Sequence, residues 1–319
     1  MSIQKTKSIL IIYGPTGVGK TDCAQIIAQQ LPSEIINLDM GQLYTPLTIG
    51  TAKPNWRSES TPHHLFDIID TPRNYSVQEY RDAVIPLIKE IWERDRLPIL
   101  VGGSGFYLRS LFFPPSVEDL AEYIPDEEIS AQNLWQDLYA IDPERAQKIH
   151  KHDVYRIKRA LSIWQSTGRK PSEYLPRYIP VAPYRIIFLN RERNELYTRI
   201  NERVHTMIEA GWLDEVRALM GTAWEPFILD KKIIGYDDLI RYFTGEHTTE
   251  SFQHTISLIQ KRTRHYAKRQ LTYWRMLQRD LIHSHEHYLR THANGFGIEL
   301  DEVNLTFTNL EEYINKLLN

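Results

Sequence analysis

The chain has 319 residues, which is long enough for one large domain with an insertion or for two domains. Its composition, 42% hydrophobic and 25% charged with a net charge of -3, is typical of a folded protein and does not by itself indicate a nucleic-acid partner. The single cysteine, Cys23, excludes a disulfide framework and a cysteine-based zinc site, and we expect it to be buried on a helix. No segment has the pattern of a signal peptide or a membrane span, so we expect a soluble, cytoplasmic protein.

The first motif is a glycine-rich segment that follows a short apolar run. Residues 8–13 have the length and composition of a buried parallel strand, and residues 14–21 match the pattern G-x-x-x-x-G-K-[ST]. Such a loop directs backbone N–H groups at phosphate oxygens, while its lysine neutralises the terminal phosphate and its threonine hydroxyl reaches Mg²⁺. The predicted phosphate-binding residues are Gly14, Pro15, Thr16, Gly17, Val18, Gly19, Lys20 and Thr21.

Two further segments that read as buried strands each end on residues that can carry chemistry. Residues 34–38 precede Asp39, and residues 98–101 precede a Gly-Gly-Ser-Gly turn at 102–105. Because the carboxyl ends of parallel strands face one crevice, we expect Asp39 near the phosphate loop, placed to accept a proton or hold a metal. A capping role is the simpler alternative for Asp39. A P-loop kinase could be built from the same parts, so this pattern leaves the acceptor open.

The middle of the chain differs from its beginning. Residues 117–183 lack strand patterns and contain several helical ones, whereas buried-strand character returns at 184–189. We therefore expect an α/β fold, a P-loop NTPase-like parallel sheet flanked by helices, with an inserted small helical domain. The predicted core comprises residues 1–116 and 184–319.

Positive charge is concentrated in two segments. Residues 142–170 hold eight Lys or Arg against three acids, and residues 261–275 hold six with no acid. On a helix, Lys261, Arg264, Lys268 and Arg275 would share one face, which is either solvated surface or a phosphate-backbone contact. The His-rich residues 283–287 are predicted to form a polar surface turn rather than a metal site.

Several short strings, in order along nearly the whole chain, resemble one enzyme family. Beside the phosphate loop they are Asp-Met-Gly-Gln-Leu-Tyr at 39–44, Ile-Gly-Thr-Ala-Lys-Pro at 49–54, Pro-His-His-Leu at 62–65, Val-Gly-Gly-Ser-Gly at 101–105, Asp-Val-Tyr-Arg-Ile-Lys-Arg-Ala-Leu at 153–161, Arg-Ile-Asn-Glu-Arg at 199–203 and Lys-Arg-Gln at 268–270. The chain resembles the tRNA dimethylallyltransferase (tRNA isopentenyltransferase) family.

The resemblance implies a reaction and its catalytic residues. The family transfers a dimethylallyl group from dimethylallyl diphosphate to the exocyclic N6 amine of the adenosine 3′ of the anticodon, with Mg²⁺, and releases pyrophosphate. Asp39 matches the general base, Lys20 and Arg203 match groups that stabilise the pyrophosphate, and Thr21 matches the Mg²⁺ ligand. Ser104 stands where the family usually has Thr, and Met40 where it usually has Ser; neither change removes the base.

The resemblance also implies how RNA is bound. The matched RNA-contacting residues are Asp39, Met40, Gly41, Gln42, Ser104, Tyr155, Arg156, Ile157, Lys158, Arg159, Lys268 and Arg269. Tyr155 replaces the usual Gln, and its ring could stack on an unpaired base of the anticodon stem–loop. No obligatory protein partner is evident, so we expect a monomer. The alternatives are an adenylate isopentenyltransferase acting on free nucleotides, a P-loop kinase, and a non-catalytic RNA-binding module.

Overall fold

The computed structural model describes residues 7–114, 131–174, 177–291 and 298–318. Contacts divide the chain into one unit of Met1–Leu111 with Pro180–Asn319 and a second unit of Phe112–Ile179. Both junctions fall earlier in the chain than the predicted positions 117 and 183. Within these described ranges, no helix is both long enough and apolar enough to cross a membrane.

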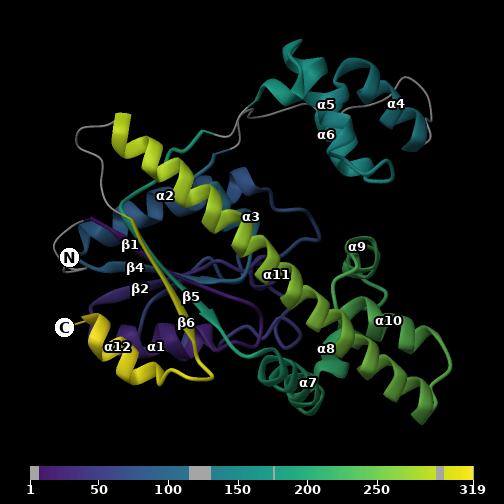
Figure 1. The fold of residues 1–319 in the computed structure, drawn as a ribbon. Coiled ribbons are helices and arrows are strands. Elements are labelled where there is room, and N and C mark those ends of the chain that lie inside the picture. Colours follow the sequence, from purple (N-terminus) through teal and green to yellow (C-terminus); the bar gives the residue numbers. More distant parts are fainter. Residues whose placement is uncertain (1–6, 115–130, 175–176, 292–297, 319) are drawn as a thin grey trace. The chain divides into compact units, whose positions relative to one another are not determined.

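A six-stranded sheet forms the centre of the first unit (Figure 1). Its strand order is β3-β2-β4-β1-β5-β6, and every neighbouring pair is parallel. The strands are β1 (Ile9–Tyr13), β2 (Ser33–Asn37), β3 (His63–His64), β4 (Leu97–Gly102), β5 (Tyr184–Asn190) and β6 (Ile298–Asn304). The predicted α/β fold is therefore confirmed, and the segments that follow β1, β2 and β4 emerge at the same edge.

Helices cover both faces of this sheet. Figure 1 shows α1 and α12 on one face and α2 and α3 on the other. The helices of this unit are α1 (Lys20–Gln30), α2 (Val77–Glu93), α3 (Gly105–Ser110), α7 (Arg193–Glu209), α8 (Trp212–Leu219), α9 (Trp224–Lys231), α10 (Tyr236–Thr244), α11 (Thr249–Thr291) and α12 (Leu310–Leu318), with short 3-10 turns η1 (Met40–Leu43) and η2 (Trp56–Ser58). Helix α2 begins at a capping box formed by Ser76 and Glu79.

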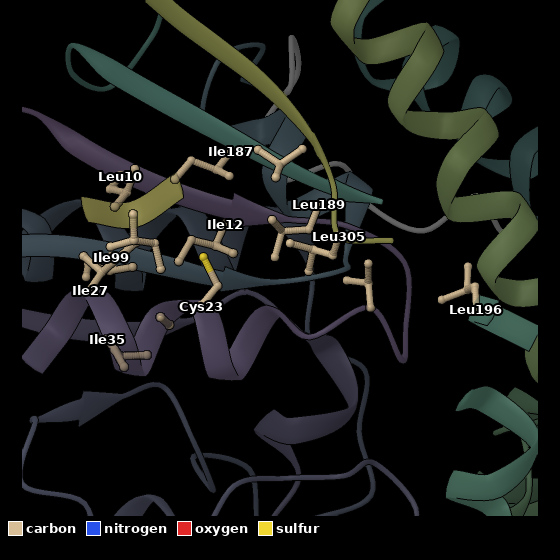
Figure 2. Packing of buried hydrophobic residues seen from close by; sticks show 14 of the residues in the cluster. Leu10, Ile12, Cys23, Ile27, Ile35, Ile99, Ile187, Leu189, Leu196 and Leu305 are labelled. Atoms are coloured by element: carbon tan, nitrogen blue, oxygen red, sulfur yellow. The ribbon is translucent and has the colours of Figure 1, made fainter. Parts of the chain in front are cut away.

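A large apolar cluster fills the space between the sheet and α1 with α12. Figure 2 shows Leu10 and Ile12 of β1 meeting Ile99 of β4 and Ile27 of α1. Because a parallel sheet is buried on both faces, its central strands β1 and β4 are nearly continuous apolar runs, and this is why they could be predicted from sequence. Cys23 lies within the cluster and is buried, as expected.

Helix α11 is much longer than the predicted basic segment at 261–275. It runs from Thr249 to Thr291, so residues 283–287 lie inside a helix and the predicted surface turn is wrong. Buried residues recur at helical spacing through this whole length: Ile256, Ile259, Ala267, Trp274, Leu277 and Leu281. That buried stripe holds the helix against the rest of the first unit beyond the basic segment at 261–275.

The second unit is a small helical body with its own core. Its elements are α4 (Ala131–Ile141), α5 (Pro143–Gln147), α6 (Val154–Thr167) and η3 (Pro171–Glu173). Asp142 and Asp153 cap α5 and α6, because their side chains accept hydrogen bonds from backbone N–H groups of the first turns. Leu134, Leu138, Ile157 and Leu161 pack together between α4 and α6.

Candidate active site

The phosphate loop, residues 14–21, joins the end of β1 to the first turn of α1. Gly17 and Gly19 have φ angles of 80° and 109°, in the left-handed region that residues with a Cβ rarely adopt. Gly19 directly precedes α1, whose first turn carries N–H groups without helical partners. The loop therefore offers backbone donors and the positive end of a helix dipole to a bound phosphate.

Lys20 is the cationic side chain of the loop. Its Nζ donates hydrogen bonds to the backbone oxygens of Gly14 at 3.0 Å and Pro15 at 2.9 Å. Burial, opposed by the nearby Asp39 carboxylate and assisted by the Arg203 guanidinium, lowers the pKa of Lys20 to about 8. The neighbouring Thr21 side chain is exposed and lines the same cavity.

Asp39 lies just beyond the end of β2 and faces the phosphate loop. Its Oδ1 accepts the N–H of Gly41 at 3.0 Å, so it does cap η1, as the simpler alternative proposed. The capping role leaves the carboxylate in the cleft, within electrostatic range of Lys20 and Arg203. Burial raises the pKa of Asp39, and the charges of Lys20 and Arg203 and the Gly41 hydrogen bond partly offset that effect.

The turn after β4 is tied to the Asp39 segment. The N–H of Met40 donates to the Ser104 hydroxyl oxygen at 2.9 Å. Gln42 is half-buried, and its amide donates to the backbone oxygens of Thr51 and Ala52, both at 3.2 Å. The structure thus brings Asp39, Met40, Gln42 and Ser104 together at one edge of the sheet.

Two arginines reach the phosphate loop from α7. Arg203 donates to the hydroxyl oxygen of Thr16 at 3.4 Å, and Arg199 donates to the backbone oxygen of Gly17 at 3.0 Å. Burial lowers the pKa of Arg203, although the Asp39 carboxylate opposes this. Arg199 was not predicted as a site residue, but its spacing of four from Arg203 places both on one helix face and could have indicated it.

Two cavities open beside this group of residues. A polar cavity of about 420 Å³ is lined by the phosphate loop and α7, and an apolar cavity of about 440 Å³ lies next to it. The two cavities share Thr16, Asp39, Thr51 and Arg203. The apolar walls come from Ile200, Val204, Met207, Trp212, Phe227, Ile233, Ile234 and Ile259. A ligand with a phosphate end and an apolar end would span the two, with Asp39 at their junction.

The remaining predicted RNA-contacting residues of the first unit lie on the surface near these cavities. Met40 is 50% exposed and, like Gly41, lines the apolar cavity. Lys268 and Arg269 are exposed on α11, and Arg269 lines the same cavity. Arg264 was predicted to share the basic face, but its guanidinium donates to Asn201 Oδ1 at 2.6 Å, so it contributes to packing against α7.

The predicted run in the second unit divides into exposed and buried residues. Tyr155 is 80% exposed, Arg156 and Arg159 are exposed, and Lys158 is half-buried. Arg156 pairs at 3.3 Å with Asp153, the residue that caps its helix. Ile157 is fully buried in the core of this unit, so its side chain cannot contact RNA and its assignment is corrected.

A phosphate loop, an acidic side chain and two arginines at the carboxyl edge of a parallel sheet define a P-loop enzyme that acts on a phosphorylated substrate. A family model described as "IPP transferase" matches residues 42–277, which is most of the chain. The chain belongs to this family, and the resemblance found in its motifs is confirmed.

Individual relatives agree with this assignment. The chain is 40% identical over 279 residues to the tRNA dimethylallyltransferase of Pseudothermotoga lettingae, covering 84% of this chain and 86% of the relative. The solved tRNA isopentenylpyrophosphate transferase of Bacillus halodurans is 32% identical, with a TM-score of 0.62 over 98% of this chain and 95% of its own. A eukaryotic dimethylallyltransferase acting on tRNA is 27% identical, with a TM-score of 0.74 over 84% of this chain and 70% of its own.

Proposed function

We propose that this protein transfers a dimethylallyl group from dimethylallyl diphosphate to the N6 amine of the adenosine 3′ of the anticodon in tRNA. Its family membership and the names of its relatives support this reaction. The observation that carries the proposal is the junction of a polar and an apolar cavity at Asp39. The diphosphate would bind in the polar cavity, which leaves the apolar walls for the prenyl chain and the adenine ring.

Asp39, Lys20 and Arg203 each have a role in this scheme. The bond between the prenyl C1 and the diphosphate oxygen breaks, a bond from N6 to C1 forms, and Asp39 accepts the proton that N6 loses. The loop N–H groups, Lys20 and Arg203 stabilise the negative charge that develops on the departing pyrophosphate. A raised pKa suits Asp39 to this role, because a carboxylate that is more basic than usual accepts a proton more readily.

The oxygen donors of the polar cavity fit a magnesium ion. The Thr21 hydroxyl and the carboxylates of Asp22 and Asp39 line this cavity, and Mg²⁺ prefers oxygen ligands, including those of substrate phosphates. We assign Thr21 as its protein ligand. When bound, the ion would neutralise charge on the diphosphate.

For RNA, we propose contacts at the mouth of the cavities and on both basic helices. Asp39, Met40, Gly41, Gln42 and Ser104 would face the target nucleotide. Basic residues of these two helices would contact backbone phosphates, and the exposed ring of Tyr155 could stack on an unpaired base. These basic residues are Arg156, Lys158, Arg159, Lys268 and Arg269.

The function is tested by following a label from the donor. The protein is incubated with Mg²⁺ and dimethylallyl diphosphate labelled in its prenyl group, together with an anticodon stem–loop or with AMP. We expect labelled RNA and one pyrophosphate released per transfer. Label on AMP but not on RNA would instead indicate an adenylate isopentenyltransferase, and transfer of the γ-phosphate from ATP would indicate a kinase.

Binding of RNA through phosphates predicts a particular dependence on salt. Removing one phosphate contact should reduce the slope of log affinity against log salt by about 0.7 to 0.9. We therefore expect Arg159→Gln and Arg269→Gln each to weaken tRNA binding and flatten this slope, with additive effects in the double variant. Filter binding across a range of salt concentrations measures both quantities.

The matched control for this prediction is Lys316→Gln, which removes one exposed positive charge from α12. The control should leave the slope unchanged, and Arg159→Gln should leave the affinity for dimethylallyl diphosphate within about twofold. Normal tRNA binding by both arginine variants at physiological salt would mean that these basic surfaces are only solvated.

A further inference from the structure

A side chain from α11 connects two loops of the candidate site. Gln270 is only 5% exposed. Its Oε1 accepts the N–H of Thr16 in the phosphate loop at 2.9 Å, and its Nε2 donates to the backbone oxygen of Gly103, in the turn after β4, at 2.9 Å. Both the oxygen and the NH₂ group of the Gln270 amide are therefore hydrogen-bonded. They connect the loops that follow the paired strands β1 and β4, at the edge where the cavities open.

The turn after β4 is shaped to accept this amide. A Cβ at Gly103 would lie 2.2 Å from Gln270 Nε2, which is far closer than any real Cβ contact. The turn therefore needs a glycine here because the glutamine amide occupies the space of a side chain. Thr16 is held from a second direction as well, since its hydroxyl accepts a hydrogen bond from Arg203.

We propose that Gln270 is a positioning residue that holds the phosphate loop in the conformation that binds the pyrophosphate part of the donor. This inference rests on the proposed function for the identity of the donor, and it assigns Gln270 no contact with the reacting atoms. Losing the amide would leave the N–H of the half-buried Thr16 without its partner, which is costly and would let the loop find other conformations. Fewer loop N–H groups would then converge on the phosphates.

The first test measures binding of inorganic pyrophosphate by calorimetry, without RNA. Gln270→Ala should raise the Kd about tenfold, which is the effect of about 1.4 kcal/mol. The matched control is Gln278→Ala, the same change about two turns later on the same helix at a half-buried position, and it should leave the Kd within about twofold.

The second test separates positioning from general stability. Gly103→Ala places a methyl group where the amide lies, so it should displace Gln270 and raise the pyrophosphate Kd by a similar factor without shortening the glutamine. Because both changes break the same interaction, the double variant Gly103→Ala with Gln270→Ala should bind pyrophosphate as weakly as either single variant. In turnover, the KM for dimethylallyl diphosphate should rise, while the Kd for tRNA stays unchanged.

Three outcomes would contradict the inference: unchanged pyrophosphate affinity in Gln270→Ala, fully multiplicative effects in the double variant, or an equal loss of tRNA affinity. A wild-type protein that binds pyrophosphate but does not modify RNA would overturn the proposed acceptor and leave this inference standing. Loss of pyrophosphate affinity in the Gln270 and Gly103 variants, but not in Gln278→Ala, would support it.

Discussion

Replacing Asp39 with asparagine should lower turnover by about 10² to 10⁴-fold while leaving the affinities for dimethylallyl diphosphate and tRNA nearly unchanged. Asparagine keeps an oxygen that can accept the Gly41 N–H, so the cap of η1 is retained and only the basic group is lost. The carboxylate is needed when N6 loses its proton, and binding precedes that step. Single-turnover measurements with saturating donor and RNA separate the two effects.

The pH dependence provides an independent check on Asp39. Only the ionised carboxylate accepts a proton, so the wild-type rate should fall as pH decreases through the pKa of Asp39. Burial raises this pKa above the ordinary aspartate value, so the fall should begin at a higher pH than for an exposed aspartate. Asp39→Asn should lose this limb of the profile. Near-normal turnover in this variant, with intact binding, would show that Asp39 serves only as a capping residue.

Removing the lysine of the phosphate loop is the second change from which we expect a large effect. Lys20→Ala should reduce kcat/KM about 10² to 10³-fold, because a preorganised cation no longer stabilises the charge on the departing pyrophosphate. The Lys20 ammonium is held in the loop by hydrogen bonds to the backbone oxygens of Gly14 and Pro15 and lies within electrostatic range of Asp39. Its position is therefore fixed before the pyrophosphate charge develops. Steady-state kinetics and pyrophosphate binding both measure the loss.

A contrast with Thr21 distinguishes the two roles in the loop. Thr21→Ala should weaken the engagement of Mg²⁺, so added Mg²⁺ should partly restore its activity, whereas it should not restore Lys20→Ala. Lys89→Ala, which removes an exposed lysine of α2, controls for the loss of one positive charge. Equal restoration of Lys20→Ala and Thr21→Ala by Mg²⁺ would contradict this division of roles.

The parts of the site that sequence could predict are those that follow buried strands. Predicted buried strands ending at 13, 38 and 101 indicated that the phosphate loop, Asp39 and the turn at 102–105 would share an edge, and they do. Strand β6 was missed because its residues alternate between apolar and charged at an outer edge of the sheet, and β3 because it has only two residues. Neither carries the apolar run that indicates a central strand.

Contacts made by single polar residues across long sequence distances could not be predicted. Gln270 bonds to Thr16, 254 positions away, and no hydrophobic or charge periodicity distinguishes it from the other glutamines of α11. The Ile157 assignment was wrong for a different reason. The RNA-contacting role of the matched run at 155–159 was assigned to every residue in it. Helical spacing of Ile157, Ala160 and Leu161 places them on the buried face of α6 and could have separated them from the exposed residues.

The burial of Cys23 has a consequence for how the protein responds to oxidants. This residue lies in the first turn of α1, three positions after Lys20, yet its side chain is fully buried, and burial raises the pKa of its thiol to about 12. Because the thiolate is the form that reacts with peroxides and disulfides, the folded protein keeps Cys23 inert at neutral pH. As the chain has no other cysteine, its phosphate loop is insulated from thiol redox control, and intact copies cannot be cross-linked through disulfides.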